Sequence, residues 1–140
     1  MGILEGKNIL VTGVTMRTSI AYAVVDIAQK EGANVVVSAA GRAVAPAQRA
    51  ISKLDTVPPL IEVDVTDPEH LAALPEKLSE HFGDRLDGIV HSIAYADPET
   101  ALGGKFLTTG WDAVSTAVHV SAYSMQSLTM AAKPMMPRGS

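Results

Sequence analysis

Residues 7–21 of the chain read KNILVTGVTMRTSIA, a pattern in which a helix follows directly on a strand. The mostly apolar run at residues 7–12 is typical of a strand that is buried on both faces. Apolar residues at 19–31 then recur at the spacing of a single helix face, and Gly32 is placed to end that helix. The connecting turn begins at Gly13, which can bend sharply and approach a ligand closely. The stretch therefore predicts one β-α unit.

The remainder of the chain repeats this alternation. Further strands are predicted at residues 34–38, 60–65 and 86–93, and further helices at residues 46–54, 67–81 and 109–130. Alternation with short connections predicts an α/β fold, a doubly wound parallel sheet of the Rossmann-like kind, incomplete and built from four β-α units. Such a fold binds its ligands outside the carboxyl ends of the strands.

Length and composition narrow the classes of protein that fit. The 140 residues suffice for one domain, residues 1–140, and a net charge of −4 from 11 basic and 15 acidic residues argues against binding of nucleic acid. The absence of cysteine excludes disulfides and thiolate chemistry. Neither a membrane span nor a signal peptide is apparent, so a cytoplasmic protein without a membrane partner is expected.

The turn at residues 13–21 is by itself a weak indicator of phosphate binding. A strand that turns into a helix N-terminus presents backbone N–H groups to an anion. The dinucleotide fingerprint G-x-G-x-x-G is absent, however, and Gly13 is its only remaining glycine. From the residues alone, a phosphate site and a simple turn with Ser19 as the helix N-cap both stay open.

Four spaced segments together carry a resemblance to a known family. They are the turn at 13–21, where Ser19-Ile20-Ala21 replaces the later glycines, Asp64-Val65, the stretch HSIA at 91–94, and HVSAYS at 119–124. In this order they resemble the enoyl-acyl-carrier-protein reductases of the mycobacterial and actinobacterial type, a divergent branch of the short-chain dehydrogenases. The resemblance covers essentially the whole chain and implies the N-terminal, dinucleotide-binding part of a longer fold. It implies an oxidoreductase that reduces the double bond of enoyl thioesters with NADH in fatty-acid biosynthesis.

The resemblance also implies cofactor-binding roles at the ends of the first and third strands. Asp64 would accept a hydrogen bond from the adenine amino group, and the backbone of Val65 would bind the ring. Read without the resemblance, Asp64 could simply cap the loop after its strand. The pyrophosphate would be held by four residues of the first turn, Gly13, Val14, Ser19 and Ile20.

The nicotinamide half of the cofactor is implied to lie at the end of the fourth strand. Ser92, Ile93 and Ala94 would line the ribose and the nicotinamide, and Val120 would pack near the cofactor. Tyr95 falls where the family often places an aromatic residue near the substrate. Without the resemblance, Ser92 and Ile93 could equally be ordinary residues at a strand end.

The four histidines indicate structure more than chemistry. His91 lies in an apolar strand and is interpreted as a structural residue with a satisfied ring, while His70 and His81 are predicted to be surface residues of a helix. His119 has no carboxylate or second histidine at ligand spacing, so no metal is predicted.

Two departures from the family pattern qualify the resemblance. The first lies after the second strand, where Ala40 stands in place of an aromatic residue that would stack on adenine. The same stretch has no acidic residue to grip a ribose 2′-hydroxyl, and Arg42 there could face a 2′-phosphate or simply be exposed. The resemblance therefore favours NADH, and Arg42 keeps NADPH open.

The second departure concerns catalysis. Reduction of an enoyl thioester leaves negative charge on the carbonyl oxygen, which needs a donor, and the family and its relatives supply a Tyr and a Lys spaced Y-x6-K or Y-x3-K. None of the three tyrosines, Tyr22, Tyr95 and Tyr123, has a lysine at either spacing. No catalytic residue is therefore assigned, and the pair is expected beyond this sequence.

Two functions stay open on this reading. The first is the cofactor-binding part of a reductase whose substrate is an enoyl thioester on acyl carrier protein or coenzyme A, inactive alone. The second is a non-catalytic nucleotide-binding module, or a structural or engineered fragment of that fold. A sheet that ends at its fourth strand exposes an edge, so a homo-oligomer is expected.

Overall fold

Four parallel strands form the centre of the molecule in a computed structural model that describes residues 2–140. They are β1 (Asn8–Thr12), β2 (Asn34–Ala39), β3 (Leu60–Glu62) and β4 (Gly88–Val90), and their order in the sheet is β3-β2-β1-β4. All three pairings are parallel, with Leu10 of β1 opposite Val36 of β2 and Ile89 of β4. This sheet confirms the predicted α/β class and the four strands.

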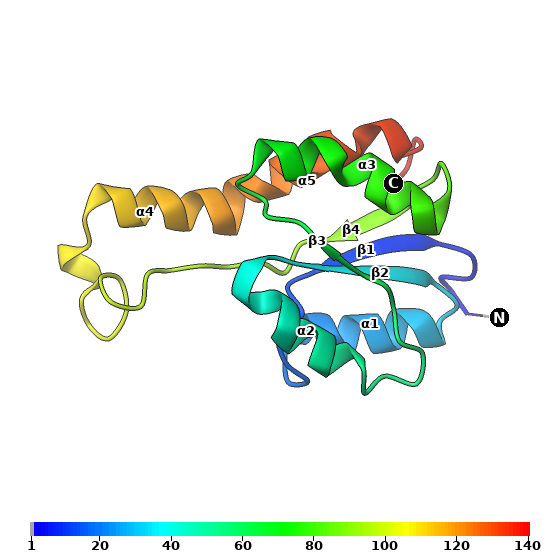
Figure 1. Ribbon diagram of the computed structural model, residues 1–140, viewed down its shortest axis with the longest axis horizontal. Coiled ribbons are helices and arrows are strands. Elements are labelled where there is room, and N and C mark those ends of the chain that lie inside the picture. Colours follow the sequence, from blue (N-terminus) through cyan, green and yellow to red (C-terminus); the bar gives the residue numbers. More distant parts are fainter. Residues whose placement is uncertain (1) are drawn as a thin grey trace.

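Helices cover both faces of the sheet (Figure 1). The helices α1 (Ile20–Lys30) and α2 (Val44–Ile51) lie on one face, and α3 (Pro68–Phe82) and α5 (Ser124–Ala132) lie on the other. The helix α4 (Trp111–Val118) extends away from this body, beyond the end of the sheet at which the strands finish. Three short 3-10 turns complete the chain: η1 (Gly41–Ala43), η2 (Phe106–Thr108) and η4 (Lys133–Met135). The order of elements makes the fold doubly wound, with its switch point between β1 and β4.

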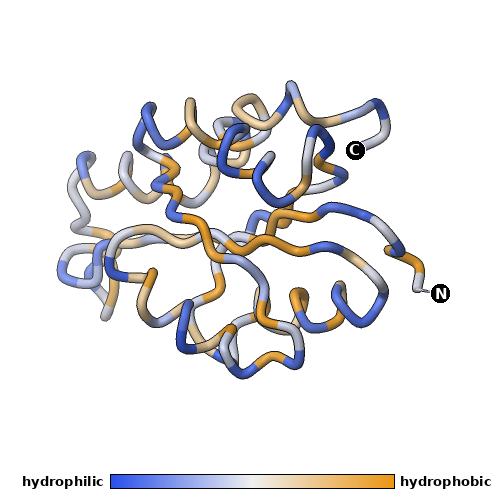
Figure 2. The backbone as a smooth tube through the Cα atoms, turned by 45° about the vertical axis from the view of Figure 1, so that its right-hand side comes forward, coloured by the Kyte–Doolittle hydropathy of each residue, from blue (hydrophilic) through white to orange (hydrophobic). Residues whose placement is uncertain are grey.

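The two central strands supply both hydrophobic cores because successive side chains point to opposite faces. Leu10 and Val36 pack in the core beneath α3 and α5, whereas Val11, Val35 and Val37 pack in the core beneath α1 and α2. Figure 2 shows this as a hydrophobic band through the middle strands, with hydrophilic segments outside it. No helix in the described part of the chain is long and apolar enough to cross a membrane.

Four elements differ from the sequence prediction by two residues or more, and the others by one residue at one or both ends. The predicted strands 60–65 and 86–93 pair only over Leu60–Glu62 and Gly88–Val90, since the chain beyond them bends toward a cleft. The predicted helix 46–54 begins at Val44 and ends at Ile51. The predicted helix 109–130 is three elements, because a π-helical turn, η3 (His119–Tyr123), separates α4 from α5. Single-turn π segments of this kind are frequent at functional sites.

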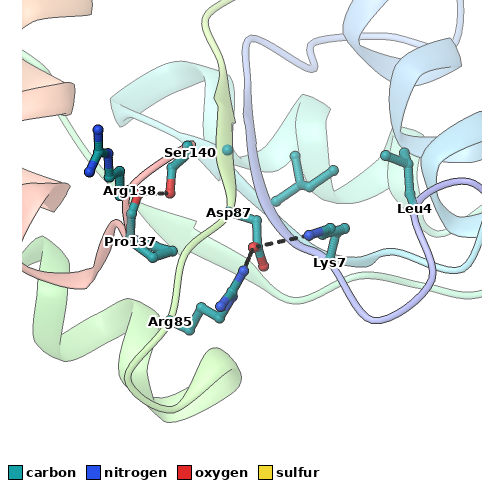
Figure 3. A pocket seen from close by; sticks show the side chains of 10 residues that line it. Leu4, Lys7, Arg85, Asp87, Pro137, Arg138 and Ser140 are labelled. Carbon is teal, nitrogen blue, oxygen red and sulfur yellow. Dashed lines mark hydrogen bonds and ion pairs between the residues drawn. The ribbon is translucent and has the colours of Figure 1, made fainter.

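The amino-terminal ends of β1 and β4 are joined by the carboxylate of Asp87. Its Oδ1 accepts hydrogen bonds from Nε and Nη2 of Arg85, at 2.8 and 2.6 Å, and Lys7 Nζ lies 3.7 Å away. Its Oδ2 accepts from the backbone N–H of Asn8 at 3.0 Å. The hydrogen bonds from Arg85 hold the pKa of the Asp87 carboxyl below its usual value. Figure 3 shows this arrangement beside a cavity of about 310 Å³ that the last residues of the chain also line.

Candidate functional site

A cleft of about 660 Å³ lies at the opposite, carboxyl-terminal end of the sheet. The ends of all four strands contribute to it, and the far wall comes from α4 and the π turn. Its lining includes eight residues predicted from the sequence to bind a cofactor: Gly13, Val14, Asp64, Val65, Ser92, Ile93, Ala94 and Val120. The structure thus brings together residues that are far apart in the sequence, at the place where doubly wound folds bind ligands.

Gly13 is required at the floor of this cleft for two reasons. Its φ of +86° lies in the left-handed region, and a Cβ atom would stand 1.8 Å from the backbone oxygen of Ser92. Thr12, just before it, is fully buried and continues the β1–β4 pairing with its side chain. Its Oγ1 donates to the backbone oxygen of Val90 at 2.9 Å and accepts from the N–H of Ser92 at 3.1 Å. The exit of β4 is thereby fixed against the first turn.

Two of the predicted pyrophosphate residues lie outside the cleft lining. Ser19 stands at the N-cap position of α1, but its Oγ donates to the backbone oxygen of Met16 at 2.6 Å and caps no helix N–H. Ile20 opens the helix and its side chain is 79% exposed. Ser19 is therefore the N-cap residue by position, as predicted, but its side chain makes no capping hydrogen bond. The first turn of α1 keeps N–H groups that no side chain caps, which is the condition for anion binding at a helix N-terminus.

Asp64 is held in place by its neighbours on the loop after β3. Its Oδ1 accepts from the N–H and the Oγ1 of Thr66, at 2.9 and 2.7 Å, and its own backbone N–H donates to Nδ1 of His70 at 2.9 Å. These hydrogen bonds from Thr66 lower the pKa of the Asp64 carboxyl. A carboxylate that is ionised at neutral pH, fixed through one oxygen and set in a cleft wall, is suited to accept a further hydrogen bond from a ligand.

His70 corrects one expectation from the sequence. It is half-buried and orders the Asp64 backbone, so it is more than a surface residue of α3. His91 confirms another, because its Nε2 lies 2.7 Å from Oγ of Ser124. Since that hydroxyl gives its only proton to the backbone oxygen of Val120, at 2.6 Å, Nε2 of His91 is the donor. His91 thus ties the end of β4 to the start of α5.

The side of the cleft next to β2 is lined by small residues. Ala39, Ala40 and Ala43 lie there opposite Asp64, so no aromatic ring offers a stacking surface. Arg42 is exposed and does not line the cleft. A further acidic group, outside the lining, comes from β3, where Oε1 of Glu62 accepts from the N–H of Gly41 at 3.2 Å. This side offers small apolar side chains to a ring and has a negative charge beside the turn at Gly41.

The chemistry that these groups support is binding. The titratable side chains in the lining are those of Asp64 and Tyr95, and they come from different strand ends. Within residues 2–140, no group of three or more His, Cys, Asp or Glu side chains could hold a metal ion. The cleft has the size and the mixed polarity of a cofactor site, without a paired acid and base.

Sequence reasoning missed the residues that position the lining. Thr12, Thr66, His70 and Ser121 each hold another residue of the cleft in place. The sequence does give a signal for Thr12, because a polar side chain within a buried apolar strand needs a hydrogen-bond partner. Thr66 and His70 contact Asp64 within the same short segment, whereas the contact of Ser121 with Tyr95 is one that only the tertiary structure brings about.

Comparison with known proteins adds to this geometry. A family model described as enoyl-(acyl carrier protein) reductase matches residues 13–140. The chain belongs to this family. It is 38% identical to the enoyl-acyl-carrier-protein reductase (NADH) of Mycolicibacterium smegmatis, and 40% identical to that of Mycobacterium avium, over 99% of its own length and 52% of each relative. With the corresponding enzyme of Neisseria meningitidis the identity is 36%, over 97% of this chain and 52% of that one.

The chain therefore spans about half the length of the curated relatives that it matches. Family membership and the mycobacterial likeness predicted from the spaced motifs are confirmed. The names of these relatives specify NADH, in agreement with the cofactor that the motifs favoured.

Proposed function

We propose that this chain binds NADH in the cleft at the carboxyl ends of its strands. The observation that carries the proposal is the convergence of eight predicted residues on one cleft, in a chain whose relatives are named for NADH. The bound cofactor supplies a hydride. In this proposal the adenine lies against the alanines after β2, where Asp64 accepts a hydrogen bond from its amino group and Val65 contacts the ring.

The other residues hold the remaining parts of the dinucleotide. Gly13 and Val14 admit the pyrophosphate close to the backbone, and the uncapped N–H group of Ile20, in the first helical turn that follows Ser19, binds its charge. The wall made of Ser92, Ile93 and Ala94 lines the ribose and nicotinamide, with Val120 packed on the other side. Among residues 2–140, no basic side chain lines the cleft, so the backbone carries the anion binding.

We propose further that the chain is the cofactor-binding part of a reductase of enoyl thioesters carried by acyl carrier protein or coenzyme A. Tyr95 lines both this cleft and an adjoining cavity of about 430 Å³ beside α4, which offers room for an acyl chain. No tyrosine of the sequence is followed by a lysine at the family's spacings. We therefore expect no turnover of an enoyl thioester by the 140-residue chain alone, and steady oxidation of NADH in its presence would contradict this.

The alternative is a non-catalytic module that binds a nucleotide and transfers nothing. It is favoured by the absence of a paired acid and base in the described lining. Complementation with a separately produced C-terminal half of a mycobacterial relative separates the two. Restored reductase activity supports the reductase part, and tight NADH binding without activity supports the module.

Isothermal titration of the chain with NADH tests the binding proposal. We expect saturable binding at one site, about tenfold weaker in Asp64→Asn and unchanged in Glu80→Gln, a matched acid-to-amide change on the outer side of α3. NADPH should bind more weakly, since Glu62 places a negative charge beside the turn at Gly41. A flat trace with NADH would overturn the proposal.

We also propose that the chain works in the cytoplasm and self-associates. The support for association is the set of large apolar side chains that the segment from residue 102 to 130 leaves exposed, among them Phe106 at 72%, Leu107 at 92% and Trp111 at 75%. Apolar surface of this extent marks an interaction site. Light scattering at increasing concentration should show a mass above 14.7 kDa, and a monomer throughout would contradict the expectation.

A further inference from the structure

The wall of the cleft that follows β4 is held by hydrogen bonds only at its two ends. Residues 92–96 make no hydrogen bond to other backbone groups in the described chain, and they are half-buried or exposed. Their backbone partners are side chains: Thr12 at the start, through the N–H of Ser92, and Ser121 at the other end. Apart from the packing of Ile93 against the core beneath α3 and α5, the position of this wall therefore depends on two hydroxyl groups.

Ser121 binds both polar groups of one residue. Its Oγ accepts from the N–H of Tyr95 at 2.9 Å and donates to the backbone oxygen of Tyr95 at 3.1 Å. A single hydroxyl thus satisfies a donor and an acceptor that lie 26 residues away in the sequence. The single hydroxyl proton is used in the bond to the Tyr95 oxygen, so the side chain donates no bond back to its own helix.

The π turn explains how Ser121 reaches the wall. In a regular helix, a serine or threonine side chain commonly bonds to the backbone one turn earlier, as Thr116 does with Asp112 in α4 and Thr129 does with Met125 in α5. The wider turn at His119–Tyr123 instead presents Val120 to the cleft and Ser121 to Tyr95. The same short element thereby supplies a lining residue and the anchor of the opposite wall.

We infer that Ser121 is a positioning residue, whose hydroxyl holds the Ile93–Tyr95 wall in the place that the nicotinamide half of the cofactor requires. The inference rests on the proposed function of the cleft. Ser121 itself is not part of the lining, whereas Tyr95 and Val120 are. Because the wall follows β4 and Asp64 follows β3, at opposite edges of the sheet, loss of the hydroxyl should affect one half of the dinucleotide only.

Calorimetric titration with two probes, NADH and ADP, tests this inference. NADH contacts the whole cleft, and ADP reaches only the adenosine side and the pyrophosphate. In Ser121→Ala we expect NADH affinity to fall five- to tenfold, since two hydrogen bonds worth about 0.5–1 kcal/mol each are lost, and ADP affinity to change less than twofold. Ser121→Thr, which keeps a hydroxyl, should restore NADH binding.

The matched control is Ser115→Ala on α4, where the hydroxyl bonds only to the backbone oxygen of Asp112, in its own helix. It should leave both affinities unchanged. Equal weakening of NADH and ADP in Ser121→Ala, or no weakening of either, overturns the inference while leaving the proposed function standing. Failure of the unmodified chain to bind NADH overturns both. Should Ser121→Ala not fold, Ser121→Cys, of similar size but with weaker hydrogen bonds, is judged by the same outcomes.

Discussion

The two ends of the β1–β4 pair are joined by different kinds of interaction. At the amino end, the charged carboxylate of Asp87 receives hydrogen bonds from Arg85 and from the backbone of Asn8, with Lys7 close by. At the carboxyl end, the neutral hydroxyl of Thr12 joins the strands, and Gly13 passes within contact of the neighbouring backbone. The first end uses charges, and the second uses none.

This difference follows from what each end must leave free. Ion pairs at the amino end occupy the charged groups there, so that end stabilises the fold. At the carboxyl end, a charged anchor would compete with or repel an anionic ligand, whereas a hydroxyl and a glycine hold the backbone without adding charge. Substitutions at the amino end should therefore change stability alone, and substitutions at the carboxyl end should change binding as well.

Gly13→Ala should have the strongest consequence. The new Cβ would meet the backbone of Ser92 in a left-handed conformation, and the two penalties together cost about 3 kcal/mol or more. We expect a large fall in the free energy of unfolding, measured with urea, and loss of NADH binding. Gly88→Ala, where a Cβ meets no atom within 4 Å, is the control. Equal stability of the two variants would contradict the packing described here.

Asp87→Ala should destabilise the fold without touching the cleft. The loss of hydrogen bonds from a guanidinium and a backbone N–H costs about 2 kcal/mol. Urea unfolding measures this loss, and NADH titration of the folded variant should give the affinity of the unmodified chain. A tenfold change in affinity would show that the two ends are coupled, against the account given above.

The stability should fall in acid, and Asp87 should account for part of the fall. Its folded pKa is lowered, so the folded chain binds a proton less readily than the unfolded chain, and protonation favours unfolding. The stabilisation is complete above the ordinary pKa of 3.8 and is lost as the pH drops through the lower folded value. Urea titrations between pH 5 and 2.5 should show that the free energy of unfolding declines less steeply with falling pH in Asp87→Asn than in the unmodified chain. The same decline in both proteins would contradict this role of Asp87.

Thr12→Val tests the carboxyl end of the β1–β4 pair, where a neutral hydroxyl joins the strands. Valine keeps the shape of the side chain but leaves the backbone oxygen of Val90 and the N–H of Ser92 without a partner, at a cost of about 1–2 kcal/mol. Since the wall of the cleft starts at Ser92, NADH affinity should fall about threefold in addition. If Thr12→Val changed the free energy of unfolding but left NADH affinity unaltered, the carboxyl end would affect stability alone, as the amino end does, and the proposed difference between the two ends would be contradicted.

The strands and their order of alternation could be predicted from the sequence because they depend on local apolar runs. Val35 and Val37 point to one face of β2 and Val36 to the other, so the strand is covered on both faces. Asp67 before Pro68 predicts the start of α3. In the structure, Oδ1 of Asp67 accepts from the N–H of Glu69 at 2.8 Å. The cleft residues came from the resemblance, since nothing local distinguishes Ser92 from other residues at a strand end.

The break in the last helix could not be predicted in the same way. The apolar spacing of residues 109–130 is continuous, and the π turn arises where Ser121 meets Tyr95 and Ser124 meets His91, which are contacts between distant segments. His70 gave no sign that it orders Asp64 either, because the contact depends on how the loop after β3 bends back onto the start of α3. The sequence alone does not show which group each of these polar side chains bonds to.

Amide chemical shifts of the isotope-labelled chain during titration with NADH compare the two ends in a single experiment. We predict saturable changes at Gly13, Ile20, Val65 and Ala94 around the cleft, with none at Lys7, Arg85 or Asp87 at the opposite end. Changes that cluster at the amino end, or no saturable change anywhere, would contradict the assignment of the carboxyl-terminal cleft as the NADH site.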